Sequence, residues 1–259
     1  AGCGSSAQSL PEATEAQAQP SGPAAPWLPA EWHDEADVIV VGTGFAGQAA
    51  AITAHDAGAE VLVIEKATEA LQGGNSRVCG QGFIAPPEEI WDAYFIYLKA
   101  LTAGLGFPIF PDEAASDETI RFYIEESSKS IKWFEDMGAY VMDDSEAMGG
   151  AAKGLFPFFP HMPGAEIVAT APGFYMIGGD YAGPGSNWYF LEDQVLERGI
   201  RKLYETPMTG LVQDPVTKEI LGVIAQREGK EYNIKAKRAV CVCAGGFEYN
   251  QQMQRDFQG

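Results

Sequence analysis

Positive charge, metal-binding motifs and long apolar runs are scarce or missing in this chain of 259 residues. It has 17 Lys and Arg against 36 Asp and Glu, and the resulting net charge of −19 argues against nucleic acid as a partner. The four cysteines include no C-x-x-C pair, so no metal site is predicted, and the haem-attachment motif C-x-x-C-H is absent. No run of about 18 apolar residues occurs, so no transmembrane helix is predicted within the chain.

The first 30 residues differ in composition from the rest. They are rich in Ala, Ser, Pro, Gln and Glu and have no apolar periodicity, so we assign residues 1–35 to a disordered tether and residues 36–259 to a folded domain. Ala1-Gly2-Cys3, followed by Gly-Ser-Ser, resembles the end of a bacterial lipoprotein signal. We therefore expect an exported protein of the cell envelope with a lipid anchor at Cys3. The alternatives are a coincidental Ala-Gly-Cys or a twin-arginine leader that is cut elsewhere.

The folded domain opens with an apolar run, a glycine-rich turn, a helical stretch and a second apolar run. Residues 38–41 and 61–64 have the composition of buried parallel strands, and residues 49–57 are predicted to form a helix. The turn contains three glycines in G-x-G-x-x-G spacing, Gly42, Gly44 and Gly47. They permit a tight turn, a close approach of a pyrophosphate to the backbone, and close packing of helix on strand, in that order. Glu65 ends the second strand, where a carboxylate can accept hydrogen bonds from a ribose diol.

This βαβ unit predicts a nucleotide site at the N-terminus of the helix, where free N–H groups and the positive end of the dipole face the phosphates. The alternative is a parallel α/β sheet whose glycine turn binds nothing. After the acid of an NAD site, the chain is expected to cross to a third strand. Here a second glycine-rich loop, GGNSRVCGQG at residues 73–82, follows instead. A third motif, VCVCAGGF at residues 240–247 with Asn250 after it, lies near the end of the sequence.

The three motifs, in this order, resemble the flavoprotein subunits of the fumarate reductase and succinate dehydrogenase superfamily. This superfamily includes 3-ketosteroid Δ1-dehydrogenases and soluble fumarate or urocanate reductases. Its members have a GxGxAG turn, an acid that closes the second strand, a G-G-N-[ST] loop with further glycines, and an apolar strand that ends in A-[TG]-G-G-F. The corresponding segments here are GTGFAG, IEK, GGNSRVCGQG and CAGGF.

The resemblance implies FAD as the cofactor. A GGNS loop presents bare backbone and small polar groups to a flat ring, whereas bulky side chains would keep the isoalloxazine away. Asn75 and Ser76 are candidate hydrogen-bond partners of the ring edge or the pyrophosphate, and Arg77 either favours the anionic reduced flavin or is a solvated surface arginine. By the same resemblance, the backbone of residues 206–208 lies against the adenine. The predicted cofactor-binding residues are Gly42, Gly44, Phe45, Ala46, Gly47, Glu65, Lys66, Gly73, Gly74, Asn75, Ser76, Arg77, Gly80, Gly82, Pro207, Met208, Ala244, Gly245 and Gly246.

The implied activity is hydride transfer through the flavin, to or from a C=C or CH–CH bond beside a carbonyl of a small-molecule substrate. An exported form would need an external electron donor or acceptor, such as a quinone-linked cytochrome. The proton donor and substrate ligands of this superfamily lie in later parts of its chains, so no catalytic residue is predicted. By the same resemblance, the sequence is interpreted as an N-terminal half without the capping domain and return segment. One alternative is a non-catalytic flavin-binding or electron-transfer module that works with a separate chain. Another is a lipid-anchored protein that uses the nucleotide fold for a different ligand.

The predicted fold class is α/β: a Rossmann-like FAD-binding domain with the βαβ unit and a β-meander, incomplete at its C-terminus. The meander comprises strands at residues 206–212, 220–227 and 232–236. Helices are expected at residues 91–103, 111–138 and 187–198, the second of them capped by Asp112 or Ser116. Residues 147–188 are rich in glycine, proline and aromatic side chains, which predicts a long loop with one short β-ribbon. The ionisable side chains of interest in this loop are His161, Tyr175, Asp180 and Tyr181.

Overall fold

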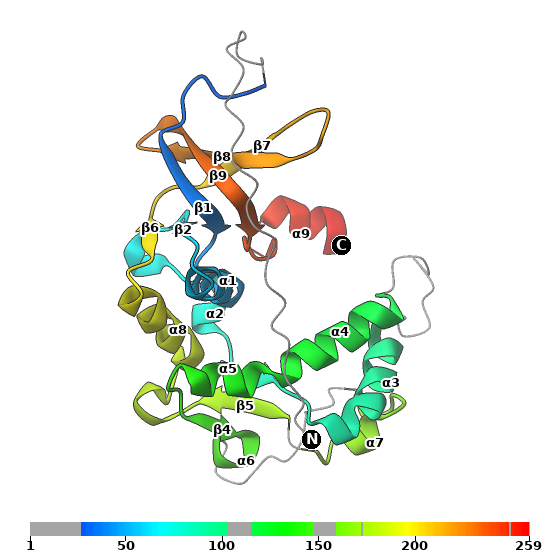
Figure 1. Ribbon diagram of the computed structural model, residues 1–259. Coiled ribbons are helices and arrows are strands. Elements are labelled where there is room, and N and C mark those ends of the chain that lie inside the picture. The colour runs from blue at the N-terminus through cyan, green and yellow to red at the C-terminus, as the bar shows by residue number, and fades with distance from the viewer. Residues whose placement is uncertain (1–26, 103–114, 148–158, 172, 249, 259) are drawn as a thin grey trace, which may run out of the picture.

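The computed structural model describes residues 27–102, 115–147, 159–171, 173–248 and 250–258 (Figure 1). Most of the predicted tether, including Cys3, therefore lies outside the described residues. Strand β1 begins at Asp34, before the expected domain boundary, and the backbone N–H of His33 already donates to the carbonyl oxygen of Asn233 at 2.8 Å. Within the described ranges, no helix has the length and apolar character needed to cross a membrane.

A six-stranded sheet organises the upper half of the molecule in Figure 1, with the strand order β6-β2-β1-β9-β8-β7. The strands are β1 (Asp34–Val41), β2 (Val61–Ile64), β6 (Arg201–Leu203), β7 (Met208–Gln213), β8 (Ile220–Arg227) and β9 (Lys230–Val242). β1 runs parallel to β2 and β9, and β2 runs parallel to β6. β7, β8 and β9 form an antiparallel meander. The predicted parallel sheet with a βαβ unit and a meander is confirmed.

Strand β9 joins two strands that the sequence presented as separate. Residues 232–236 of the meander and the apolar run at residues 240–242 form one continuous strand, which pairs with β8 over its first part and with β1 along most of its length. The register of β1 against β9 shifts between Ala36 and Val38, as at a β-bulge. Pairing with β1 on one side keeps the backbone extended through the polar residues between these two stretches.

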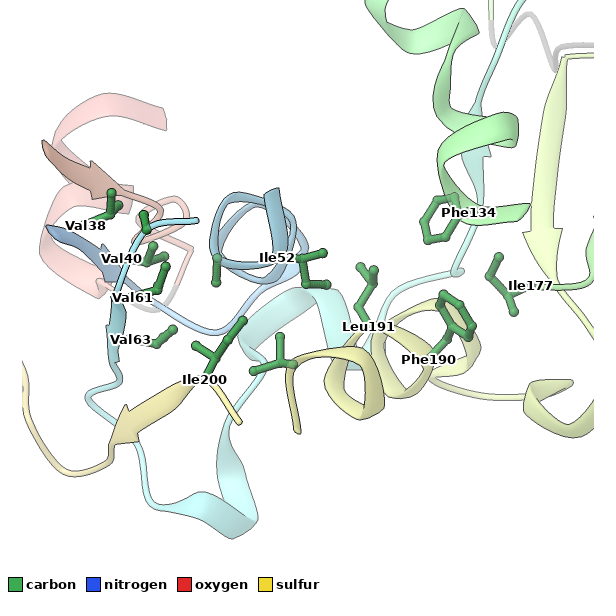
Figure 2. Close-up of a cluster of buried hydrophobic side chains, with 13 residues drawn as sticks. Val38, Val40, Ile52, Val61, Val63, Phe134, Ile177, Phe190, Leu191 and Ile200 are labelled. Carbon is green, nitrogen blue, oxygen red and sulfur yellow. The ribbon is translucent and has the colours of Figure 1, made fainter. Parts of the chain in front are cut away.

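Helix α1 (Phe45–Asp56) packs on one face of this sheet against β1 and β2, and helix α8 (Ser186–Glu197) packs against α1. Val38 and Val40 face these helices, whereas Ile39 and Val41 belong to a second cluster on the opposite face. β1 is therefore buried on both faces, as its unbroken apolar sequence predicts. Figure 2 shows the first cluster, which extends from the strand valines past α1 and α8 to aromatic and aliphatic side chains of the lower half.

Helix α1 begins at Phe45 rather than at the predicted Ala49. Gly47 lies inside its first turn, and a glycine there lowers the intrinsic helix propensity. Contacts with the neighbouring turn at Gly42 override that preference, and they are described with the site below.

The lower half of the molecule contains a small antiparallel sheet with the order β3-β5-β4 and a group of helices (Figure 1). Its strands are β3 (Phe83–Ile84), β4 (Val141–Asp143) and β5 (Phe174–Ile177). Its helices are α3 (Trp91–Thr102), α4 (Asp117–Ser128), α5 (Ser130–Asp136), α6 (Asp144–Ala147) and α7 (Ala165–Val168). The remaining α-helices of the described residues are α2 (Gly74–Val78) and α9 (Gln251–Gln258), and the 3-10 turns are η1 (Glu69–Leu71), η2 (Glu88–Ile90) and η3 (Gly179–Tyr181).

The predicted helix at residues 111–138 is two helices, α4 and α5, and residues 111–114 lie outside the described part of the chain. Ser116 is the N-cap of α4, and its Oγ accepts from the backbone N–H of Thr119 at 3.1 Å. At the other end, the hydroxyls of Ser127 and Ser128 donate back to carbonyl oxygens of the preceding turn, at 3.1 and 2.7 Å. Such back-bonding competes with the helical ladder and favours a break, which the apolar periodicity alone did not reveal.

The predicted long loop at residues 147–188 contains more regular structure than expected. Its described part includes α7 and β5, and β5 is the central strand of the small sheet. The described part of the loop does not form the predicted β-ribbon: it contributes the single strand β5, whose partners β3 and β4 come from outside the loop. Short elements of this kind gain their stability from tertiary packing rather than from sequence propensity, so local sequence patterns do not predict them.

Candidate cofactor site

The first glycine turn follows β1 directly and needs its glycines for steric reasons. Gly42 has a φ of +103°, and a Cβ on this residue would be 2.5 Å from the carbonyl oxygen of Cys243. A Cβ on Gly47 would be only 1.9 Å from the carbonyl oxygen of Gly42. The backbone of α1 therefore packs directly on the turn, and no larger residue fits at either position.

The N-terminus of α1 offers an anion site. Its N-cap, Gly44, makes no side-chain cap, and the first turn contains no acidic residue. The backbone N–H of Phe45 donates to the Oγ of Ser76 at 3.0 Å, and Ala46 is exposed beside it. Apart from this one hydrogen bond to a neutral hydroxyl, the positive end of the helix has no compensating side chain, which suits a pyrophosphate.

The second glycine loop lies directly against the first turn. Besides the contact of Ser76 with Phe45, the backbone N–H of Gly73 donates to the Oγ1 of Thr43 at 3.0 Å. Gly73 itself has a φ of +100° and is the N-cap of α2. Two glycine-rich segments whose bonded residues are 30 and 31 positions apart in sequence thus form one surface at the carboxyl end of β1. Ligands bind at this edge of a parallel sheet.

Glu65 lies at the same edge, at the end of β2, and is buried. Its Oε2 accepts from the N–H and the hydroxyl of Thr43 at 3.1 and 2.5 Å, and its Oε1 accepts from the N–H of Ala67 at 2.8 Å. Its carbonyl oxygen accepts from the N–H of Thr206 at 2.8 Å, so the segment expected to lie against the adenine starts beside the residue expected to bind the ribose. A carboxylate has about four lone-pair positions, so Glu65 can accept ribose hydroxyls in addition. Lys66, its neighbour, is exposed.

The third motif reaches the site from β9. The N–H of Cys243 donates to the carbonyl oxygen of Val41 at 2.9 Å, which places residues 243 and 244 beside Gly42. Ala244, Gly245 and Gly246 are exposed where the strand ends. Asn250, which followed the motif in the sequence, has a structural role, because its Oδ1 accepts from the N–H of Met253 in the first turn of α9 at 3.0 Å.

The glycines of the second loop test whether a flat group fits this surface. Gly74 has a φ of +52°, so its own backbone explains its glycine, and at Gly82 a Cβ would be 1.7 Å from the ring of Phe174. Gly80 has neither restriction, because its φ is ordinary and an added Cβ would meet no atom within 4 Å. The described chain gives no internal reason for a glycine at position 80, whereas the approach of a flat ring to bare backbone does. The residues present therefore fit the isoalloxazine of FAD.

A family model described as "FAD binding domain" matches residues 37–257. This chain belongs to the FAD-binding domain family. FAD is the cofactor of this family, and the predicted resemblance to the fumarate reductase and ketosteroid dehydrogenase flavoproteins is confirmed.

Two enzymes illustrate the sequence relationship. The 3-oxo-5-alpha-steroid 4-dehydrogenase of Comamonas testosteroni is 28% identical over 208 residues, which cover 74% of this chain and 38% of that enzyme. The vinyl phenol reductase of Lactiplantibacillus plantarum is 32% identical over 224 residues, which cover 86% of this chain and 40% of that enzyme.

Solved structures agree. The 3-ketosteroid-delta4-(5alpha)-dehydrogenase of Rhodococcus jostii RHA1 aligns with a TM-score of 0.65 and 26% identity, over 88% of this chain and 49% of that structure. A flavocytochrome c3 fumarate reductase in an open conformation shares the fold, with a TM-score of 0.64 and 22% identity. The alignment covers 86% of this chain and 36% of that structure. The chain spans less than half the length of each of these four proteins.

Arg77 of this FAD-binding family member is not the solvated surface arginine that was one of its two expected roles. Its Nη1 donates to the carbonyl oxygens of Ala70 and Gln72 at 2.7 and 3.3 Å, so it closes the loop that contains η1 and α2. Its guanidinium lies 5.3 Å from the ring centroid of Trp188 and 5.7 Å from that of Tyr189. Arg77 is thus a partly buried support of the second loop, and direct contact with the flavin stays a prediction.

Sequence reasoning missed three buried residues at this site, Thr43, Gln81 and Trp188. Thr43 occupies a variable position of the glycine motif, yet its hydroxyl links Gly73 to Glu65. The indole Nε1 of Trp188 donates to the carbonyl oxygen of Thr43 at 2.8 Å. The positive φ of a non-glycine residue, +60° at Gln81, is a structural sign of a special position that a sequence does not display.

A second polar group lies behind the glycine loops. Glu192 on α8 and Lys202 on β6 form a buried ion pair, and Glu192 also accepts from the side-chain amides of Gln48 and Gln72, at 3.1 and 3.2 Å. The hydroxyl of Tyr204 donates to the Oε1 of Gln72 at 3.2 Å. This network joins α1, the second loop, α8 and β6 into one support.

The four ionisable side chains of the predicted loop are in different surroundings. His161 and Asp180 are exposed, and Tyr175 lies beside Phe83, with their ring centroids 5.9 Å apart. The hydroxyl of Tyr181 donates to Asp193 at 2.7 Å, and this hydrogen bond, together with burial, raises the pKa of Tyr181 to about 12.

Proposed function

We propose that this chain is the FAD-binding part of an oxidoreductase that transfers hydride to or from a C=C or CH–CH bond next to a carbonyl group. The observation that carries the proposal is the junction of the two glycine loops through Gly73 and Thr43 and through Ser76 and Phe45. Relatives whose names specify steroid dehydrogenation or reduction of vinyl phenol and fumarate support this reaction class.

Each part of the site has a role in this proposal. The N-terminus of α1 binds the pyrophosphate, Glu65 accepts the ribose hydroxyls, and the backbone from Thr206 to Met208 supports the adenine. The second loop presents the bare backbone of Gly80 and the exposed amide of Asn75 to the ring system. Bound FAD supplies the hydride chemistry, and the residues of this chain place and orient it.

A second candidate is a flavin-binding or electron-transfer module that acts together with another chain. The observation in its favour is coverage, since the aligned segments are 36–49% of the relatives and structures named above. In either case the electron donor or acceptor is external to the described residues, and a quinone-linked cytochrome is the partner that we propose.

The first experiment uses Gly80→Ala, with Gly210→Ala as the matched control. Gly210 also has an ordinary φ, and an added Cβ there would make an ordinary contact of 3.6 Å with Ile224. Neither change is expected to lower the free energy of unfolding of the apoprotein, and each can raise it by up to about 1 kcal/mol. We expect Gly80→Ala to raise the Kd for FAD about tenfold or more, and Gly210→Ala to leave it unchanged, as measured by quenching of flavin fluorescence.

Equal FAD affinity of both variants would contradict the placement of the ring against the second loop. A wild-type chain that binds no FAD in the titration would refute the proposed function itself. The reaction class is tested by reducing the bound flavin and adding fumarate or a 3-keto-4-ene steroid without oxygen. Reoxidation by either acceptor supports the first candidate. Reoxidation by a cytochrome but by neither acceptor supports the second.

A further inference from the structure

Trp188 in the first turn of α8 contacts both glycine loops at once. Its Nε1–H donates to the carbonyl oxygen of Thr43 in the first turn, at 2.8 Å. On the second loop, a Cβ at Gly73 would be 2.6 Å from Cε2 of the indole, so Gly73 packs against the indole too closely for any side chain. The side chain is only 2% exposed.

Gln81 connects the other end of the second loop to the same helix. Its Oε1 accepts from the backbone N–H of Trp188 at 3.2 Å, and its Nε2 donates to the carbonyl oxygens of Ser76 and Cys79 at 2.7 and 3.1 Å. It is 2% exposed and retains a φ of +60°, a conformation that side-chain-bearing residues adopt rarely. The three hydrogen bonds stabilise this conformation at the turn between Gly80 and Gly82.

We propose that Trp188 and Gln81 are positioning residues for FAD: they fix the second loop relative to the G-x-G-x-x-G turn before the cofactor binds. This inference rests on the proposed function. The two parts of FAD that these segments receive, the pyrophosphate and the ring, are joined by the ribityl chain, so the separation of their protein sites must match the reach of that chain. A loop that is already ordered does not lose conformational entropy on binding, and preorganisation of this kind raises affinity without a new contact.

The test compares Trp188→Phe and Gln81→Met with the control Trp133→Phe. Phenylalanine at 188 keeps an aromatic face for Gly73 but lacks the N–H donor, and methionine at 81 keeps the length but lacks both hydrogen-bonding atoms. Trp133 lies on α5 and contacts Phe134 edge-on, with ring centroids 5.0 Å apart, in the lower half of the molecule. The change from Trp to Phe is therefore the same at a position that does not touch the loops.

We expect the Kd for FAD to rise about tenfold in Trp188→Phe and in Gln81→Met, and to stay within about twofold in Trp133→Phe. Hydrogen–deuterium exchange of the apoproteins separates positioning from general loss of structure. Amides of residues 73–82 should exchange faster in the first two variants, while those of β1 keep the wild-type rate.

Three outcomes overturn the inference. Unchanged FAD affinity in both variants removes the positioning role and leaves the proposed function intact. Faster exchange in β1 as well as in the loop assigns both residues to general stability. A wild-type chain that binds no FAD refutes the proposed function, and the inference with it.

Discussion

Replacement of Thr43 by valine tests the hydrogen bonds that join the site. The change is isosteric and removes only the hydroxyl, which donates to Glu65 at 2.5 Å and accepts from the N–H of Gly73 at 3.0 Å. A hydrogen bond to a charged group contributes about 1.5–3 kcal/mol, and a buried N–H without a partner costs about 1–3 kcal/mol. Glu65 keeps the backbone N–H of residue 43 and that of Ala67, so its charge stays partly satisfied. We expect the free energy of unfolding to fall by about 3 kcal/mol.

The assay is urea unfolding of the apoprotein, followed by circular dichroism. With a slope of about 1–3 kcal/mol per molar urea, the midpoint should fall by about 1–3 M. Thr53→Val is the control, because Thr53 is exposed on α1 and the same substitution there should change stability by less than about 0.5 kcal/mol. A loss of less than about 1 kcal/mol at Thr43, or an equal loss at both positions, would refute the assignment of Thr43 as the link between the loops.

Three further changes have defined outcomes. Gly47→Ala should cost at least about 3 kcal/mol in urea unfolding, because its Cβ would be 1.9 Å from a backbone oxygen, and a loss below 1 kcal/mol would contradict this close packing. The pKa of Tyr181, raised from 10.0 to about 12 by the hydrogen bond to Asp193 and by burial, implies stability that is fully present below pH 10 and declines toward pH 12. The Tm of Tyr181→Phe should therefore fall less between pH 9 and 11 than that of the wild type. An equal fall in Tm for both proteins would contradict a raised pKa of Tyr181. Lys202→Met leaves its buried carboxylate partner unpaired and should cost about 3–5 kcal/mol, whereas Lys132→Met, at an exposed pair, should cost less than about 1 kcal/mol; similar losses would disprove the difference.

The sheet and the first glycine turn could be predicted because their causes are local. β1 and β2 are apolar at every buried position, which is the pattern of strands covered on both faces. Gly47 is required by its contact with Gly42 within one βαβ unit, and Gly42 by its own φ of +103°, so their spacing alone predicts the geometry. The same holds for Ser116 at the start of α4, where the cap and the N–H that it satisfies are three residues apart.

The supports of the site could not be predicted, because they act over long separations. Trp188 contacts the carbonyl of Thr43 across 145 residues, and its N–H contacts Gln81 across 107. In the sequence, the tryptophan has the pattern of an ordinary apolar helix residue and the glutamine that of a polar loop residue. Only the fold brings them together, and nothing within a window of a few residues marks either one.

The pairing of β1 with β9 also determines when the chain can complete its fold. Val41 pairs with Val242, so the second edge of β1 has no partner until about 200 further residues have been made. At about 5–20 residues per second, synthesis of that length takes about 10 to 40 s. During this interval the apolar second half of β1 presents an unpaired edge to other nascent chains, and contacts of such high sequence separation also form slowly. On the ribosome, the βαβ unit is therefore synthesised early, but its sheet is completed only after β9 has been made. The unpaired edge of β1 is a segment to which a chaperone can bind during this interval.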